Sequence, residues 1–279
     1  MTTQDQAPQD QASASHYVLG HDEREWDRLE QQHRVWRDTL LTSLDARALG
    51  PGTRVLEVGC GNGALLRDLA ERVGSSGRAV GVERNPEAVA RARAALADLP
   101  WTTVHEADVF ELDGGTLGGS FDLVVMRWVL SFLPSPERVL ERVVDHLRPG
   151  GLLVVQDYNY DGIRVEPPQP GLEFLFRTVP KVYEHHGGDA WIAARLPRLY
   201  SELGLELVAV EPHCKAGGPD SDAFRWAERF FHEHLQTFVD DGLMTEAERD
   251  AALTGWADAR ITPGSVFFSP LVVNVIGRR

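Results

Sequence analysis

Short apolar runs alternate with amphipathic stretches along most of the chain. Seven runs have the length and composition typical of strands: 55–58, 78–83, 101–106, 121–126, 152–156, 205–210 and 266–276. Between them, apolar residues recur every three or four positions, as in helices that pack one face on a sheet, over 64–73, 86–97, 136–146 and 196–203. Continuous apolar runs are typical of parallel strands that are buried on both faces. The alternation predicts an α/β fold with a doubly wound, mostly parallel, seven-stranded sheet.

The remaining segments flank or interrupt this alternating region. Residues 1–15 lack apolar periodicity and are expected to form a disordered tail. Residues 16–50 contain a helical pattern and are expected to form an N-terminal helical lid. We expect a sheet core over 51–160 and a cap insertion over 161–195. The C-terminal part of the core is expected over 196–279, with a helical insertion within it at 221–260.

A glycine-rich turn follows the first strand, in the sequence Val-Leu-Glu-Val-Gly-Cys-Gly-Asn-Gly over 55–63. Glycine has no β-carbon, so the backbone can turn sharply and approach a ligand at Gly59, Gly61 and Gly63. The helix that begins at Ala64 directs free N–H groups toward the same place. The turn is typical of a site for a nucleotide-like cofactor. It also matches the dinucleotide pattern G-x-G-x-x-G/A, so a nicotinamide or flavin stays an alternative at this point.

The carboxylate of Glu57, two positions before the first glycine, favours a different cofactor. It would repel a pyrophosphate, whereas S-adenosylmethionine (SAM) carries an ammonium and a sulfonium that a carboxylate attracts. The run from Glu57 to Gly63 resembles the E/D-x-G-x-G-x-G motif of the class I SAM-dependent methyltransferases. The resemblance extends over residues 50–160 and implies a methyltransferase with SAM as its cofactor.

The resemblance also implies which residues bind the cofactor. Glu83 ends the second strand, where a carboxylate can accept hydrogen bonds from both ribose hydroxyls. Asp108 resembles the acid that accepts from the adenine amine, with Val109 or Phe110 covering the ring. Tyr17, in the N-terminal segment, is expected to close over the methionine end of SAM. Three residues within or directly after these motifs complete the expected cofactor site: Cys60, Arg84 and Arg127.

The amino-acid composition limits the classes of partner that the protein is expected to bind. The chain has 28 basic and 42 acidic residues among 279, and the net charge of -14 disfavours binding to a nucleic-acid backbone. No segment approaches the roughly 20 apolar residues of a membrane span, and residues 1–15 contain no apolar signal core. Cys60 and Cys214 are the only cysteines, which disfavours a disulfide framework. We expect a cytoplasmic enzyme with a small-molecule methyl acceptor, no nucleic-acid or membrane partner and, where it self-associates, a homodimer.

Methyl transfer requires alignment of the acceptor with the methyl group and, for some acceptors, removal of a proton. Many small-molecule O-methyltransferases have a histidine just after the fourth strand, but this chain has Arg127-Trp128-Val129 there. His186 in the cap insertion and Tyr158 after the fifth strand are therefore the candidate catalytic residues. No metal site is expected, because the catechol-type enzymes have an acidic ligand after the fourth strand, where this chain has Met126 and Arg127.

The sequence thus predicts a SAM-dependent methyltransferase that modifies an O, N or C atom of a small molecule, as in secondary metabolite biosynthesis. Two alternatives keep the SAM site: a reaction other than methylation, such as a cyclisation, and methylation of a protein. A nicotinamide oxidoreductase would bind NAD(P) instead of SAM, and Glu57 disfavours it.

Overall fold

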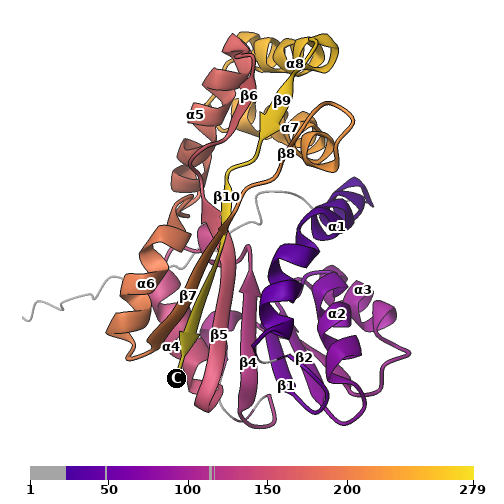
Figure 1. Cartoon of the computed structure of the whole chain (residues 1–279), viewed down its shortest axis with the longest axis vertical. Coiled ribbons are helices and arrows are strands. Elements are labelled where there is room, and N and C mark those ends of the chain that lie inside the picture. The colour runs from indigo at the N-terminus through magenta and orange to yellow at the C-terminus, as the bar shows by residue number, and fades with distance from the viewer. Residues whose placement is uncertain (1–22, 48, 113–114, 116) are drawn as a thin grey trace, which may run out of the picture.

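The computed structural model describes residues 23–279 with the exception of 48, 113, 114 and 116. A central sheet has the strand order β3-β2-β1-β4-β5-β10-β7, and only β10 runs antiparallel to its neighbours (Figure 1). The strand bounds are β1 Arg54–Val58, β2 Arg78–Glu83, β3 Thr102–Glu106, β4 Phe121–Arg127, β5 Leu147–Asn159, β7 Glu206–His213 and β10 Leu271–Arg278. The predicted α/β fold with a mostly parallel, seven-stranded sheet is confirmed.

Helices cover both faces of this sheet because its strands are apolar on both faces. Leu123 and Val125 of β4 pack in one cluster with helices α1 (Glu23–Asp45), α2 (Ala64–Val73) and α3 (Pro86–Ala95). Val124 and Met126 of the same strand pack in another cluster with α4 (Pro136–Asp145) and α6 (Ile192–Glu202). Successive side chains of a strand point to opposite faces, so a continuous apolar run is buried only between two helical layers.

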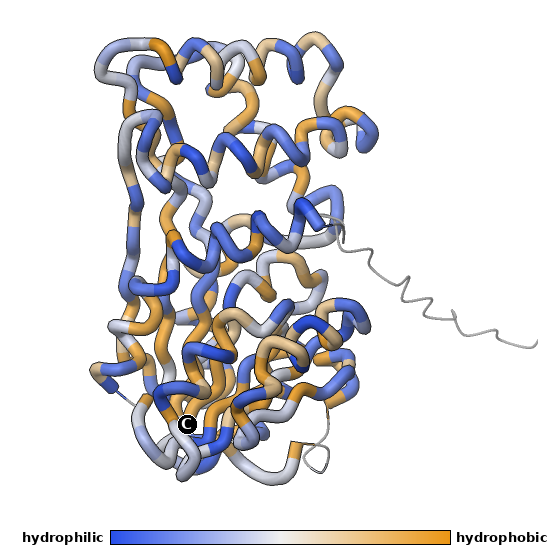
Figure 2. The backbone as a smooth tube through the Cα atoms, turned by 90° about the vertical axis from the view of Figure 1, so that its right-hand side faces the viewer, coloured by the Kyte–Doolittle hydropathy of each residue, from blue (hydrophilic) through white to orange (hydrophobic). Residues whose placement is uncertain are grey.

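A second unit, the cap, lies beyond the carboxyl ends of the parallel strands (Figure 1). It contains helices α5 (Pro170–His185), α7 (Asp222–Asp240) and α8 (Glu246–Ile261) and a small antiparallel sheet of β6 (Arg164–Glu166), β9 (Val266–Phe268) and β8 (Ala216–Gly217). Figure 2 shows hydrophobic positions concentrated along the strands of the central sheet and scattered through the cap helices. Aromatic rings form much of the interior of the cap, with Trp256 in contact with Phe176, Phe224, Phe231 and Phe267.

One expected strand is divided in the structure. The run 266–276 forms β9 of the cap sheet and β10 of the central sheet, with Ser269 and Pro270 between them. Proline has no N–H to donate to a strand ladder, and the Ser269 hydroxyl accepts from Lys215 N and donates to Pro270 O. The chain therefore leaves one sheet at this point and joins the other.

Candidate active site

A cleft of about 1360 Å³ lies at the carboxyl ends of β1, β2 and β4, between the first half of α1 and the end of α5. The carboxyl edge of an open α/β sheet is the place where such folds bind ligands. Tyr158 and His186, the candidate catalytic residues, both line the cleft. So do most of the expected cofactor residues: Glu57, Gly59, Cys60, Gly61, Glu83, Arg84, Asp108, Val109 and Arg127.

Two of the expected cofactor residues are not among those that line the cleft. Tyr17 lies outside the described residues. Gly63 has a φ of +83° at the start of α2, and a β-carbon there would come within 3.0 Å of Ala92 in α3. The close packing of α2 on α3 is the reason for glycine at 63.

The glycine turn joins β1 to α2 and exposes its backbone to the cleft. Gly59 N and Cys60 N both donate to Val82 O, at 2.8 and 3.0 Å, which fixes the turn against β2. A β-carbon on Gly61, whose φ is +52°, would meet nothing within 4 Å, so this position faces open space. The Cys60 side chain is instead buried, and burial raises the pKa of its thiol. Cys60 therefore offers the cleft its backbone and not a thiolate.

Backbone N–H groups hold the carboxylates of Glu83, at the end of β2, and Asp108, just after β3. Oε2 of Glu83 accepts from Gly61 N at 3.0 Å, and Oε1 accepts from Asn85 N at 2.9 Å. Oδ1 of Asp108 accepts from Phe110 N at 2.9 Å. Each carboxylate oxygen has a second lone pair, so both side chains are fixed in orientation and still able to accept from a ligand.

Glu57 and Arg127 each leave one buried polar atom without a hydrogen-bond partner among the described residues: Oε2 of Glu57 and Nη1 of Arg127. Burial raises the pKa of Glu57 to about 8, although Arg127 acts in the opposite direction. Burial lowers the pKa of Arg127 to about 10, against the effect of Glu57 and Asp68. A buried polar atom without a partner is costly, so the pair is suited to a ligand that brings one positive and one negative group.

His33 on α1 links Arg127 to α2. Nη2 of Arg127 lies 3.0 Å from Nδ1 of His33, and Nε2 of His33 lies 2.9 Å from Oδ2 of Asp68. Burial lowers the pKa of His33, so the neutral ring accepts from Arg127 and presents its N–H to Asp68. Sequence reasoning missed this residue. The signal that could have found it is a histidine in the apolar stripe that Leu29 and Trp36 form on the first helix.

Aromatic rings line the part of the cleft beside Arg127, whose guanidinium carbon lies 5.0 Å from the centre of the Trp128 ring. Tyr158 stacks on Trp128 with 6.0 Å between ring centroids and meets Tyr183 edge-on at 6.4 Å, and Phe132 lies 5.2 Å from Tyr183. All four line the cleft, and we call them the aromatic cluster. Trp128 has a φ of +52°, a backbone conformation that is strained for a bulky residue and that occurs at functional sites. The cluster offers flat apolar surface to a ligand.

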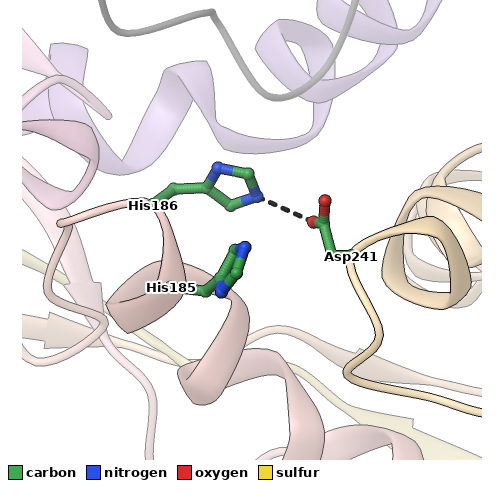
Figure 3. Close-up of side chains that lie close together, drawn as sticks. All are labelled: His185, His186 and Asp241. Carbon is green, nitrogen blue, oxygen red and sulfur yellow. Dashed lines mark hydrogen bonds and ion pairs between the residues drawn. The ribbon is translucent and has the colours of Figure 1, made fainter. Parts of the chain in front are cut away.

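His186 lines the same cleft as the aromatic cluster and is paired with a residue that sequence analysis did not single out. Its Nε2 lies 2.8 Å from Oδ2 of Asp241, just after α7 (Figure 3). His185 precedes it at the end of α5, and one ligand atom from each of the three residues lies within 4.8 Å of the others. This group could hold a metal ion. Asp241 is 55 positions from His186, and only the folding of the cap brings the two together.

Comparisons with known proteins identify the family. Residues 56–153 match the model of a methyltransferase domain family. The chain is 30% identical over 167 residues to the ubiquinone biosynthesis O-methyltransferase of Xanthomonas axonopodis pv. citri, a match that covers 60% of this chain and 68% of that protein. This chain belongs to the class I SAM-dependent methyltransferases. The enzyme therefore uses SAM and falls in EC 2.1.1.

Two further comparisons bear on length and fold. A 37.1 kDa protein in transposon TN4556 of Streptomyces fradiae is 32% identical over 184 residues, which are 64% of this methyltransferase and 50% of that protein. The crystal structure of a SAM-dependent methyltransferase from Aquifex aeolicus has a TM-score of 0.52 at 18% identity, and the match covers 69% of this chain and 93% of that chain. At this identity the likeness concerns the fold alone. No helix in the described part of the methyltransferase is both long and apolar enough to cross a membrane.

The cleft fits SAM on its own geometry. The unpartnered Oε2 of Glu57 and Nη1 of Arg127 suit the two ionic groups of the methionine part. A bound ammonium would lower the raised pKa of Glu57 and pair with its carboxylate, and Arg127 would donate to the carboxylate of SAM. The open space beside Gly61 would be filled by any side chain at that position.

Proposed function

We propose that this methyltransferase transfers the methyl group of SAM to an O, N or C atom of a small molecule with a flat apolar body, in secondary metabolite biosynthesis. One observation carries the proposal. A single cleft contains the unpartnered Glu57 and Arg127 and, directly beside Arg127, the aromatic cluster. The cofactor and acceptor regions are therefore continuous. The ubiquinone biosynthesis O-methyltransferase to which the chain is similar also has, by its name, a small-molecule acceptor.

The cofactor contacts follow from the positions of the side chains. We assign the SAM ammonium to Glu57, the SAM carboxylate to Arg127 and the ribose hydroxyls to Glu83. Asp108 accepts from the adenine amine, with Val109 beside the ring. The backbone at Gly59 and Gly61 allows close approach, and Cys60, Arg84 and, from the N-terminal segment, Tyr17 complete the assignment. When bound, SAM supplies an electrophilic methyl group.

The acceptor contacts involve the aromatic cluster and the residues beside it. Stacking on Trp128 or Tyr158 would fix the plane of the acceptor and exclude water from the reacting atoms. Alignment of this kind contributes about 7 to 11 kcal/mol to the lowering of a bimolecular barrier. An O–H or N–H acceptor must also lose a proton. Two groups among the described residues could accept it: Tyr158 and the His186–Asp241 pair, whose His186 lines the same cleft as Tyr158.

Calorimetric titration of the purified enzyme with SAM, S-adenosylhomocysteine (SAH) and NADH tests the proposal at the cofactor. We expect SAM and SAH to bind in the micromolar range and NADH not to bind. The second stage measures SAH release in the presence of a panel of aromatic O–H, N–H and activated carbon acceptors. Binding of SAM with product formation but without SAH release would instead support a non-methylation reaction, and methylation of proteins alone would overturn the assignment of a small acceptor.

A further inference from the structure

Three possible metal ligands converge at the acceptor end of the cleft. His185 is the last residue of α5, His186 follows it, and Asp241 follows α7. Each residue offers one ligand atom, and the three atoms lie within 4.8 Å of one another. Figure 3 shows the His186 ring directed at the Asp241 carboxylate and the His185 ring standing beside them.

Their chemistry suits a first-row transition metal. Two imidazoles and one carboxylate are the donor set of many zinc and non-haem iron sites, whereas Mg²⁺ and Ca²⁺ prefer oxygen ligands. The two imidazole rings lie close together, with 5.0 Å between their centroids. Nε2 of His186 and Oδ2 of Asp241 are 2.8 Å apart, close to the roughly 3 Å that separates neighbouring ligands around an ion with 2.0 to 2.2 Å bonds.

The position of the group decides what such an ion could contact. His185 and His186 line the same cleft as Tyr158 and Tyr183 of the aromatic cluster. Asp241, which follows α7, completes the group. Three protein ligands leave two or three coordination positions on a five- or six-coordinate ion. Because both histidines line the cleft, we expect an ion bound to them to contact the space that the proposed function gives to the acceptor.

We propose that His185, His186 and Asp241 bind a divalent transition-metal ion, and that this ion holds the acceptor through two neighbouring oxygen atoms. The second part rests on the proposed function. The expectation from sequence that the enzyme has no metal site is revised here. That expectation rested on the residues after β4, whereas these ligands come from the two insertions.

The ion also accounts for proton removal. Coordination lowers the pKa of an acceptor O–H group, and the proton passes to solvent. A carboxylate-paired His186 is then a ligand and no longer the proton acceptor. The acceptor oxygen forms a bond to the methyl carbon as the bond between that carbon and sulfur breaks, which gives the methyl ether and SAH. The charges balance, because the sulfonium becomes a neutral thioether and one proton is released.

Titration of the full-length, metal-free enzyme with Co²⁺, followed by visible absorption, tests the site without any acceptor. We expect bands that saturate at one equivalent, and at least tenfold weaker binding in His185→Gln and in Asp241→Asn. His232→Gln is the matched control, because His232 is exposed on α7 and outside the group, and it should bind Co²⁺ like the wild type. Equal Co²⁺ affinity in the wild type and in both site variants would overturn the site. SAH binding by calorimetry should be unchanged in all three variants, which shows that they are folded.

A second measurement tests the contact with the acceptor and separates it from the proposed function. Catechol, with two neighbouring oxygens, should shift the absorption bands of the Co²⁺-loaded enzyme, and phenol, with one, should not. Absorption bands that do not shift when catechol is added would overturn the proposal that the ion holds the acceptor. Equal rates of SAH release by the metal-free and the Co²⁺-loaded enzyme, measured with the same acceptor, would also overturn this role of the ion. They would still support the proposed methyl transfer. Failure of SAM to bind would contradict the proposed function alone, because the Co²⁺ titration does not depend on it.

Discussion

Replacement of Glu57 by Gln should make the free enzyme more stable and its cofactor binding weaker. The carboxyl lies almost fully buried at the end of β1, and its Oε2 has no hydrogen-bond partner among the described residues. Such a group disfavours ionisation in the folded protein, whereas the unfolded chain ionises it freely. Glutamine keeps the shape and cannot ionise. The change therefore removes a cost to folding and, at the same time, the negative charge that we assign to the SAM ammonium.

The magnitude follows from the pKa of Glu57, which is about 8 in the folded enzyme against an ordinary value of 4.5. Because the folded pKa is the higher one, the stability associated with this group is complete below pH 4.5 and is lost as the pH rises through 8. Proton linkage gives a cost of about 1 kcal/mol at pH 5 and about 3 kcal/mol at pH 7. The advantage of Glu57→Gln over the wild type should therefore grow by about 2 kcal/mol between these two pH values.

Urea unfolding at pH 5, 6 and 7 measures this difference, and titration with SAH at pH 8 measures the loss of binding. Glu202→Gln is the control, because Glu202 is an exposed glutamate on α6 away from the cleft. It should change neither quantity. Stability curves of Glu57→Gln and the wild type that run parallel across this pH range would refute the reasoning about burial, and undiminished SAH affinity would refute the assignment of the ammonium.

Three further substitutions test the cofactor site. Gly61→Val should abolish SAM and SAH binding with the fold retained by circular dichroism, because the new side chain enters the open cleft; a variant that binds would contradict the placement of the turn. Glu83→Ala should weaken SAM by about 2 to 3 kcal/mol in calorimetry, since a charged acceptor of hydrogen bonds is lost, and unchanged affinity would reject the ribose contact. Arg127→Met should weaken SAH by about 2 kcal/mol and leave adenosine unaffected, because adenosine lacks the amino-acid carboxylate. An equal loss for both ligands would mean that Arg127 acts on the fold of the cleft.

The sequence could predict that the expected cofactor residues lie together because most of them belong to local motifs. Glu57, Gly59 and Gly61 lie in one strand and its turn, and Glu83 ends the next strand. The carboxyl ends of parallel strands meet at one edge, so an α/β pattern already brings such residues together. Gly63 is the exception within the motif. Its φ of +83° was foreseeable from its place in the turn, but its contact with Ala92 depends on the packing of two helices.

The remaining features of the cleft depended on contacts between distant segments. Asp241 reaches His186 because α5 and α7 pack in one cap, and His33 reaches Arg127 because α1 lies across the end of β4. Neither pair has a fixed spacing that a pattern could reveal. Hydrophobic periodicity reports which face of an element is buried, but not which partner buries it. The sequence by itself therefore determined the seven-stranded sheet, the order of strands and helices along the chain, and the cofactor. Only the tertiary structure decided which histidine meets which carboxylate.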